Sequence, residues 1–553
     1  MTACDRDVLR SKQGPALESG AELIHPEQRS GRRAVSHQPN SSGGTPPSSL
    51  TRHPQGSYPS TCPPTAAADT HDALPCALMD VDGQPPLCAT FPRNSPPDRL
   101  DRGVSSPMLL SFRFANHRSF RDEQQLNLVP VYDSAGDSGQ ERSAVPVVGV
   151  FGANASGKSN LIDAFSYMRT LVGRSDRDVE PGLGLERRSF RLDPEIAAYP
   201  SSYAVDLRLE GIRYTYGFTL DDDGILEEWL HSYPKNRSRT IFERRRSDFS
   251  WGDETRHTQL TRLADIVAPT ALFLSVVARF GRFDSSSDPN RPRADLLEPL
   301  HSVYSWIWLR QVVDRSSTSN TFITRQLKEI ASRWVSDDHQ RAIVVDLLRS
   351  ADIGLLDVTV SPPPQLALFP ESLPDEDLSR AIPSNRGRER EPQLRFRHRG
   401  ATEDVLFDLA DESSGTIRLL QSAVRAVPIL ERGGLVLIDE IDASLHPLLT
   451  AKLIALFQSR DVNLNDAQLI FTSHDATLLG LLDGEEVLRR DQVWFTQKNS
   501  DGASELFPLS DFKPRKAGEN RMRRYLSGSY GAIPEVSMQL FEQALRSEPQ
   551  GNA

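Results

Sequence analysis

The stretch that decides the fold is VVGVFGANASGKSNLIDAFSYM, from Val147 to Met168. It begins with a short, β-branched apolar run that ends in glycine, which is typical of a buried strand. It continues with Leu161, Ile162 and Phe165 at helical spacing, which indicates an amphipathic helix. A glycine-rich turn lies between the two. The stretch therefore predicts a phosphate-binding turn between a strand and a helix.

The turn matches the Walker A pattern of nucleotide-binding proteins at every fixed position. Its glycines allow backbone N–H groups to turn toward a β-phosphate, and the following helix directs its positive end there. Lys158 is expected to reach the β- and γ-phosphate oxygens, and the hydroxyl of Ser159 to ligate Mg²⁺. A glycine turn that matches by chance is the alternative, and the flanking strand and helix argue against it. We expect ATP and Mg²⁺ to bind at Gly152, Ala153, Asn154, Ala155, Ser156, Gly157, Lys158, Ser159 and Asn160.

A second buried strand, LVLIDE, ends in Asp439 and Glu440. A carboxylate at the tip of a buried parallel strand faces the crevice in which ligands of open sheets bind. Asp439 is expected to hold Mg²⁺, and Glu440 to orient or deprotonate the water that attacks the γ-phosphate. An acidic helix start, in which the two carboxylates only cap, is the alternative.

His474 ends a third apolar run, LIFTSHD. A lone histidine at a strand end is more often an ordinary hydrogen-bonded residue. Beside a Walker A turn and an acidic strand, however, it is expected to sense the γ-phosphate. Lys158, Glu440 and His474 are therefore the predicted catalytic residues of an ATPase.

Four segments differ in composition. Residues 1–107 hold 16 of the 39 prolines and have no sustained apolar periodicity, so we expect a disordered extension, with Met108 as an alternative start. Residues 108–280 are predicted to form the first ATPase lobe, with the Walker A turn and an antiparallel β subdomain. Helical texture and a Pro- and Ser-rich loop follow at 281–393, and residues 394–553 form the second lobe and a C-terminal tail. Strands that alternate with helices predict an α/β P-loop NTPase fold with a mostly parallel sheet.

Composition also indicates in which cellular compartment the protein is expected. All cysteines fall within residues 1–107, so disulfides and Cys-ligated metals are not expected elsewhere: Cys4, Cys62, Cys76 and Cys88. No stretch is long enough to span a membrane, and the N-terminus has no hydrophobic signal core. We expect a cytoplasmic protein without a membrane partner. The net charge of −11 offers no argument for nucleic-acid binding, although it does not exclude it.

A further serine- and glycine-rich turn precedes a helix in DESSGTIRLLQSAV, at Ser413, Ser414 and Gly415. Helix N-termini bind anions, and a second such turn is redundant within one nucleotide site. In order along the chain, the Walker A turn, this turn, LIDE, ASLH (443–446) and TSHD resemble the ABC-type ATPase heads of the SMC, RecF and OLD kind. The resemblance implies that two heads enclose two ATP molecules, each site being completed by Ser413 and Gly415 of the other copy.

Two departures from that family stand out. Ser414 replaces the first glycine of the family's signature, which weakens the expected contact in trans. The Mg²⁺-binding glutamine of the family's Q-loop cannot be placed. MLLSFRFANHRSF, ADIGLLDV and the tail YLSGSYGAIPEV resemble more closely the AAA-15/AAA-21 ATPases of the RloA or AbiLi kind, over roughly residues 108–540.

This closer resemblance implies a role in abortive infection and phage defence, often beside a separately encoded TOPRIM-like nuclease. Only 79 residues follow His474, too few for such a nuclease domain, so we expect it on another chain. The alternative is a RecF- or SMC-like repair or recombination ATPase that binds duplex DNA. Its candidate phosphate contacts are the basic clusters at 243–246, 386–390, 395–399 and 521–524, each of which an ordinary solvated face also explains. A transporter subunit fits the signature less well.

Overall fold

The structure is a computed structural model of the 553-residue chain. It describes residues 106–132, 144–177, 184–252, 258–281, 294–315, 320–334, 338–351, 354–361, 393–513, 519–534, 538–539 and 542. The chain divides into two units, residues 1–74 and 75–553, and every described residue belongs to the second. The predicted extension therefore lies outside the described residues except for 106 and 107, as does most of the loop expected near 361–393.

The Walker A stretch forms the middle of a six-stranded sheet with the order β18-β17-β3-β14-β13-β9. Neighbouring strands are parallel except for β18, which pairs antiparallel with β17. The expected mostly parallel sheet is thus confirmed. Its strands are β3 (Val147–Gly152), β9 (Gln311–Asp314), β13 (Leu435–Ile438), β14 (Gln468–Ser473), β17 (Val493–Lys498) and β18 (Ser504–Pro508).

Both faces of this sheet are covered, because alternate residues of each strand point to opposite sides. On β3, Val148 and Val150 pack into the core that contains α1 (Lys158–Arg174), whereas Val147 and Phe151 pack into the core that contains α10 (Pro447–Gln458). Continuous apolar strands are the expected consequence of this two-sided burial. The arrangement places the carboxyl ends of β3, β13 and β14 at one edge, where the Walker A turn and the acidic pair both lie.

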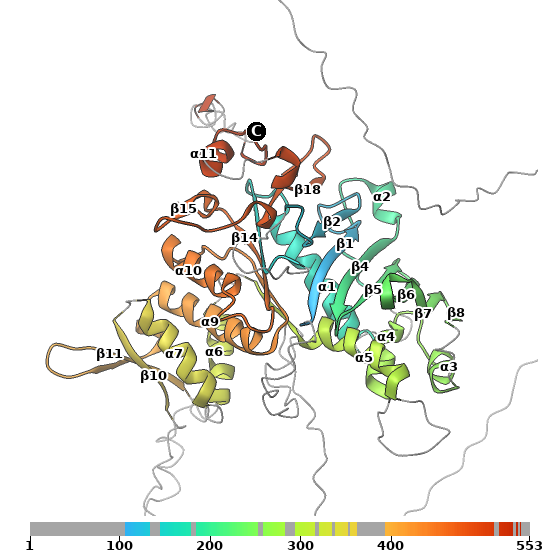
Figure 1. Cartoon of the computed structure of the whole chain (residues 1–553), viewed down its shortest axis with the longest axis horizontal. Helices are drawn as coiled ribbons and strands as arrows, with labels where there is room; N and C mark the ends of the chain where they lie inside the picture. Colours follow the sequence, from blue (N-terminus) through green and yellow to red (C-terminus); the bar gives the residue numbers. More distant parts are fainter. Residues whose placement is uncertain are drawn as a thin grey trace, which may run out of the picture. The chain divides into compact units, whose positions relative to one another are not determined.

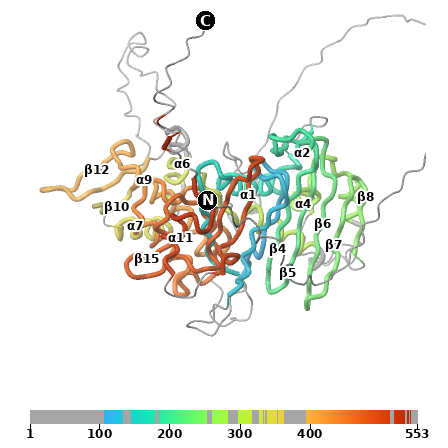
Figure 2. The backbone as a smooth tube through the Cα atoms, turned by 90° about the horizontal axis from the view of Figure 1, so that it is seen from above, coloured from blue at the N-terminus to red at the C-terminus, as the bar shows by residue number. Residues whose placement is uncertain are grey.

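The predicted antiparallel subdomain is a seven-stranded sheet with the order β2-β1-β4-β5-β6-β7-β8, which Figure 2 shows side by side from β4 to β8. Phe112 on β1 stacks on Phe165 of α1, with ring centroids 3.8 Å apart, so this sheet and the Walker A helix share one core. The strands are β1 (Met108–Ala115), β2 (Gln124–Asn127), β4 (Ser201–Leu209), β5 (Ile212–Leu220), β6 (Ile225–Tyr233), β7 (Arg239–Arg245) and β8 (Asp248–Trp251).

Three helices pack around the same core (Figure 1): α3 (Thr258–Ala264), α4 (Phe273–Phe280) and α5 (Ala294–Leu309). The short α2 (Pro194–Ala198) has no buried residue. Trp306 and Trp308 of α5 are buried, and the Trp308 ring lies 4.4 Å from the guanidinium carbon of Arg169.

A separate core joins three helices to a small antiparallel sheet with the order β10-β11-β12. Its elements are α6 (Asn320–Trp334), α7 (Asp338–Ser350), β10 (Leu355–Ser361), β11 (Gln393–His398), β12 (Val405–Phe407) and α9 (Ser414–Arg432). The C-terminal α11 (Arg521–Leu526) packs elsewhere, on the α10 side of the central sheet, where Tyr525 stacks on Phe495 of β17 at a centroid distance of 5.5 Å.

Two strands depart from the expected layout. Helices and a loop are expected at 281–393, but β9 and β10 both lie within this segment, and β9 pairs in parallel with β13. Four residues between helices are too few to show a strand periodicity, so this pairing is a tertiary effect. The mixed α/β class expected from the sequence is otherwise confirmed. In the part of the chain that the structure describes, no helix has both the length and the apolar character needed to cross a membrane.

Candidate functional site

The Walker A turn joins β3 to α1, and its shape depends on glycine. Gly157, the residue before α1, has a φ of +115°, which side chains of L-residues rarely adopt. A Cβ at this position would also lie 2.5 Å from the hydroxyl oxygen of Ser504 on β18. The hydroxyl of Ser156 lies 2.6 Å from that of Thr496 on β17. The two neighbouring strands thus hold the turn closely from outside.

Lys158 folds back over this turn. Its Nζ donates to the carbonyl oxygens of Gly152 at 2.8 Å and Ala153 at 3.0 Å, and lies 3.3 Å from Nδ1 of His474. The side chain comes from the first residue of α1, while the histidine follows the end of β14. Two of the predicted catalytic residues, 316 positions apart in the sequence, are therefore in contact.

The charge of Lys158 is finely balanced. Burial lowers the pKa of its ammonium group to about 8, although the nearby carboxylates of Asp439, Glu440 and Asp442 act in the opposite direction. Bound phosphate is an additional negative charge, and it would favour the protonated form. A phosphate bound here would therefore raise the pKa of this lysine again.

The residues expected to hold Mg²⁺ meet at the same edge. Asp439 directly follows β13, and its Oδ1 accepts a hydrogen bond from the hydroxyl of Ser159 at 3.1 Å. Mg²⁺ prefers oxygen ligands and is commonly held by one or two carboxylates together with substrate phosphates and water. These two oxygens are suitable ligands for Mg²⁺. An ion held there would place its positive charge next to the phosphates.

Glu440 lies one residue beyond Asp439 in a left-handed backbone conformation, with a φ of +52°. Its backbone N–H donates to the hydroxyl of Thr472 at 2.8 Å. One carboxylate oxygen lies 3.8 Å from Nε2 of His474, and both side chains are partly exposed, at 43% and 38%. His474 thus lies between Lys158 and Glu440, and the carboxylate is accessible to a water molecule.

Sequence reasoning missed two members of this site. Thr472 bonds to both acidic residues, since its hydroxyl donates to Asp439 Oδ1 at 2.6 Å in addition to accepting from Glu440. Asp442 accepts from the backbone N–H of His474 at 3.4 Å. The available signal was that Thr472 lies two residues before His474, near the end of the same apolar run.

Arg418 was also missed, because nothing in a helical arginine marks it. It lies on α9, with one guanidinium nitrogen 3.0 Å from Asp314 Oδ2 at the end of β9. The other donates to the backbone carbonyl oxygens of Asp439 at 3.1 Å and Glu440 at 3.3 Å. This one side chain therefore joins the helix of the serine-rich turn to the end of the acidic strand.

The serine-rich turn begins α9 and is exposed. Ser413 caps the helix, its hydroxyl accepting from the backbone N–H of Thr416 at 3.0 Å. A Cβ on Gly415 would lie 3.0 Å from the carbonyl oxygen of Ser444, so the turn lies beside the ASLH loop. Within the described ranges, the hydrogen bonds of the Ser413 side chain all go to Thr416. Among the described residues, no hydrogen bond of the Ser413 side chain therefore reaches the Walker A turn of the same chain.

The basic clusters offered as DNA contacts are largely paired within the chain. Arg244 is 2% exposed and lies beside buried Glu228. Arg521 and Arg524 form ion pairs with Glu486 and Glu519. The remaining described arginines with carboxylate partners in these clusters are Arg245, Arg246, Arg395 and Arg397, and the cluster at 386–390 lies outside the described residues.

Distant likenesses to solved structures accompany this geometry. An SMC head bound to the C-terminal winged-helix domain of ScpA is 10% identical, with a TM-score of 0.36, over 73% of this chain and 99% of that one. The SMC head domain from Thermotoga maritima is 12% identical, with a TM-score of 0.33, over 72% and 98%. An SMC head with an extended coiled coil, bound to the C-terminal domain of ScpA and derived from Pyrococcus furiosus, is 10% identical, with a TM-score of 0.35, over 74% and 98%.

No curated protein matches the sequence. The model of the AAA_21 family, described as "AAA domain, putative AbiEii toxin, Type IV TA system", matches residues 147–480. This range is more than half of the chain, and it contains Lys158, Ser159, Asp439, Glu440 and His474. The chain belongs to the AAA_21 family of AAA-domain proteins.

Proposed function

We propose that this protein binds and hydrolyses ATP with Mg²⁺ and works as a switch in which two copies close around the nucleotide. The observation that carries the proposal is the meeting of Lys158, Ser159, Asp439, Glu440 and His474 at one edge of the central sheet. These groups would hold phosphate, place Mg²⁺ and direct a water molecule, which together are what ATP hydrolysis requires.

Closure by a second copy is supported by the position of the serine-rich turn. Ser413 and Ser414 are exposed at the start of a 19-residue helix whose N-terminal N–H groups favour anions. In the proposed dimer, this turn and Gly415 contact the γ-phosphate held by the other copy. ATP can drive such closure only if it binds the closed form more tightly than the open one.

The family description names a toxin of a type IV toxin–antitoxin system, and the sequence resembles abortive-infection ATPases of the RloA or AbiLi kind. We therefore place the switch in anti-phage defence, where opening and closing control a separately encoded effector nuclease. The alternative, a repair or recombination ATPase that clamps duplex DNA, receives little support from the basic clusters, since most of their described arginines are paired within the chain.

Glu440→Gln tests the hydrolytic part of the proposal. The substitution keeps the shape of the side chain but removes the base, so hydrolysis should fall by about 10²- to 10⁴-fold while ATP binding persists. With ATP, the variant should accumulate as a dimer in analytical ultracentrifugation, and the Glu440→Gln/Lys158→Ala double variant should not. A single variant that stays monomeric at saturating ATP would contradict closure around the nucleotide.

Complementation tests which copy supplies the serine-rich turn. Lys158→Ala removes the phosphate ligand of one half-site, and Ser413→Arg blocks the other half-site. Neither variant should hydrolyse ATP alone. If the two halves come from different copies, a mixed dimer has one intact composite site and activity reappears when both chains are co-expressed. If each chain holds its nucleotide alone, the mixture stays inactive.

A further inference from the structure

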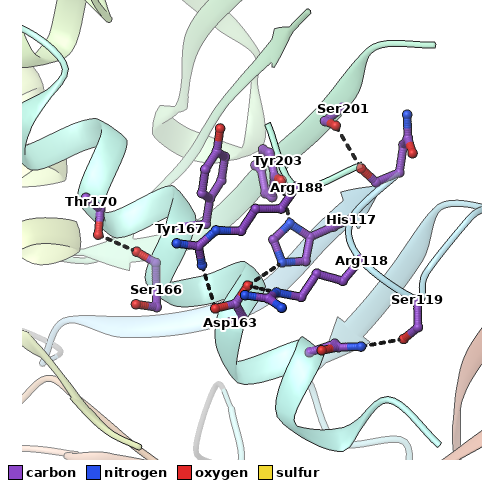
Figure 3. Close-up of polar contacts among 12 residues, drawn as sticks. His117, Arg118, Ser119, Asp163, Ser166, Tyr167, Thr170, Arg188, Ser201 and Tyr203 are labelled. Carbon is purple, nitrogen blue, oxygen red and sulfur yellow. Dashed lines mark hydrogen bonds and ion pairs between the residues drawn. The ribbon is translucent and has the colours of Figure 1, made fainter. Parts of the chain in front are cut away.

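Three arginines converge on Asp163 in the second turn of α1 (Figure 3 shows two of them). Arg118, from the turn between β1 and β2, donates through Nε to Oδ2. Arg188, from the segment before α2, and Arg315, which directly follows β9, each donate to Oδ1 at 2.6 Å. Segments that lie far apart in the sequence thus bring their guanidinium groups to one carboxylate.

The cluster carries more positive than negative charge. His117 also contacts Asp163, with Nε2 3.1 Å from Oδ2, but burial lowers the pKa of this ring, so it is neutral at pH 7. Within the described ranges, Asp163 is the only carboxylate within ion-pair distance of the three arginines. One carboxylate balances one guanidinium group, which leaves a surplus of two positive charges.

Asp163 is held firmly, which fixes the arginines in turn. Nδ1 of His117 lies 2.7 Å from the hydroxyl of Tyr203, whose side chain is fully buried. The neutral ring therefore accepts from Tyr203 and donates to Asp163. Arg188 is further placed over the ring of Tyr167, at 5.4 Å from the centroid. A ligand would meet an arrangement that already exists, and little ordering would be needed on binding.

The arginines retain donors that face solvent. Arg118, Arg188 and Arg315 are 45%, 34% and 46% exposed, whereas Asp163 is 7% exposed. Each guanidinium group has five N–H donors in a planar fork that matches phosphate geometry. The carboxylate of Asp163 is thus buried, whereas the three guanidinium groups are partly exposed. An anion that arrives from solvent can reach them.

The cluster lies beside the Walker A turn, since Ser119, next to Arg118, accepts a hydrogen bond from Asn160 at 2.7 Å. Asp163, however, is at another level of the helix. Asp163 is four residues beyond Ser159, which puts it about 6 Å further along the helix axis. The N–H groups that cradle a triphosphate belong to the turn before α1, not to this level of the helix. Arg315 follows Asp314, at the end of the strand next to β13. An anion bound here would be a neighbour of the nucleotide.

We propose that Arg118, Arg188 and Arg315 bind the phosphate group of a phosphate monoester, in addition to the triphosphate held by the Walker A turn. The charge decides the class of ligand. A monoester carries about −1.5 to −2 at pH 7 and matches a surplus of two positive charges. A phosphodiester carries only one negative charge and leaves half of the surplus unbalanced.

Calorimetric titration of the full chain tests this assignment, with Lys158→Ala as the background so that the Walker A turn does not compete. The probe is phenyl phosphate, a monoester, compared with dimethyl phosphate, a diester, at constant ionic strength. Saturable binding of phenyl phosphate is expected, and Arg188→Gln or Arg315→Gln should weaken it by at least about tenfold, because each removes charge-assisted hydrogen bonds.

Arg213→Gln is the matched control. Arg213 is 47% exposed, pairs with the single carboxylate of Asp206 at 3.2 Å and lies 5.0 Å from the ring of Tyr233, as Arg188 does beside its own tyrosine. This variant should bind phenyl phosphate like the background. Thermal unfolding midpoints establish that all variants are folded.

The assignment is overturned if phenyl phosphate does not saturate, if Arg188→Gln and Arg315→Gln bind it unchanged, if Arg213→Gln weakens it equally, or if dimethyl phosphate binds as well. None of these titrations involves ATP, Ser413 or a second copy, so their outcome is independent of the proposed ATP switch.

Discussion

Thr472 donates a hydrogen bond to Asp439, with the hydroxyl oxygen 2.6 Å from Oδ1. The same hydroxyl accepts from the backbone N–H of Glu440 at 2.8 Å. A single side chain on β14 thus sets the position of both acidic residues at the end of β13. In the proposed ATPase, these residues would hold Mg²⁺ and activate water, so Thr472 should affect both steps.

Thr472→Val removes the hydroxyl and keeps the shape of the side chain. Partners that orient a metal ligand typically contribute about 10- to 100-fold to metal affinity or activity. We therefore expect the Mg²⁺ concentration for half-maximal ATP hydrolysis to rise by about tenfold or more, as measured by Mg²⁺ titration of steady-state hydrolysis. Thr472→Ser keeps the hydroxyl and should behave like the unmodified protein. An unchanged Mg²⁺ requirement in the valine variant would show that Asp439 needs no orienting partner.

ATP affinity should depend on pH through Lys158. In the folded protein without nucleotide, the pKa of Lys158 is lowered to about 8. ATP binding above that pH therefore requires the uptake of a proton. Affinity should therefore fall as pH rises from about 8, by up to about tenfold per pH unit. Fluorescence or calorimetric titrations with Mg²⁺ and ATP between pH 7 and 9.5 measure this slope. Lys158→Arg, whose charge does not titrate, should abolish it.

The lowered pKa of Lys158 has the opposite effect on folding stability, which should rise with pH where ATP affinity falls. Between about pH 8 and the ordinary lysine pKa of 10.5, the unfolded chain binds more protons than the folded chain. The contribution of Lys158 to stability therefore increases with pH across that window and is unfavourable below it. The fall of ATP affinity over the same range is thus not a consequence of unfolding.

Arg418→Met should separate the serine-rich helix from the acidic strand. The variant loses the hydrogen bonds to the carbonyl oxygens of Asp439 and Glu440 and one ion pair to Asp314. We expect kcat for ATP hydrolysis to fall clearly while ATP affinity changes little, because the Walker A turn is untouched. Steady-state kinetics combined with nucleotide titration distinguish the two quantities.

Arg425→Met is the matched control for that substitution. Arg425 is similarly buried and contacts the same oxygen of Asp314 at 3.0 Å, but it also donates to the backbone carbonyl oxygen of Gln421 and to the side chain of Gln326. Loss of either arginine removes an ion pair to Asp314, which by itself should lower the free energy of unfolding by about 1–3 kcal/mol. Only Arg418→Met should lower kcat strongly. Equal losses of kcat would mean that the ion pair, not the carbonyl contacts, supports hydrolysis.

The seven-stranded sheet contains a buried ion pair, and the loss of one partner should be strongly destabilising. Glu228 is fully buried, accepts from the backbone N–H groups of Phe273 at 2.6 Å and Leu274 at 3.0 Å, and lies 3.6 Å from Arg244. Removing one partner of a buried pair leaves an uncompensated charge and costs about 3–5 kcal/mol. Arg244→Leu should therefore lower the thermal unfolding midpoint sharply, whereas Arg245→Leu, at an exposed position next to it, should not.

The pH dependence of that loss has a definite sign. Burial raises the pKa of Glu228, so the folded chain binds more protons than the unfolded chain above the ordinary value of 4.5. Stability from this group falls as pH rises through that window. Without Arg244 the carboxyl group should hold its proton to higher pH still, and the Arg244→Leu defect should shrink as pH is lowered from 8 to 5. A defect independent of pH would mean that lost packing, not charge, is responsible.

Local signals were sufficient for the nucleotide cradle and much of the sheet. The strand, the glycine turn and the first turn of α1 are contiguous, and the required φ of Gly157 is a property of that residue type. The carboxyl-end positions of Asp439 and His474 also follow from short apolar runs. In contrast, β9 is only four residues long and became a sheet strand through pairing with β13, which no local periodicity shows.

Charged residues show most clearly what could not be predicted from the sequence alone. As sequence, the cluster at 243–246 looks like a solvated face or a DNA contact, yet Arg244 lies inside the protein beside Glu228. Arg315 and Asp163 are 152 residues apart and meet only in the folded chain. Whether an arginine is exposed, paired or part of a cluster depends on which strands and helices pack together.

The amino-acid sequence by itself determined the phosphate-binding turn, the acidic strand end and the α/β class, because these depend on backbone conformation and apolar spacing within a few consecutive residues. Only the tertiary structure decided the partners of Asp439, Asp163 and Glu228, because electrostatic and hydrogen-bond partners are selected by distance in space. Side chains that complete a site from other strands leave no mark in the stretch that they serve.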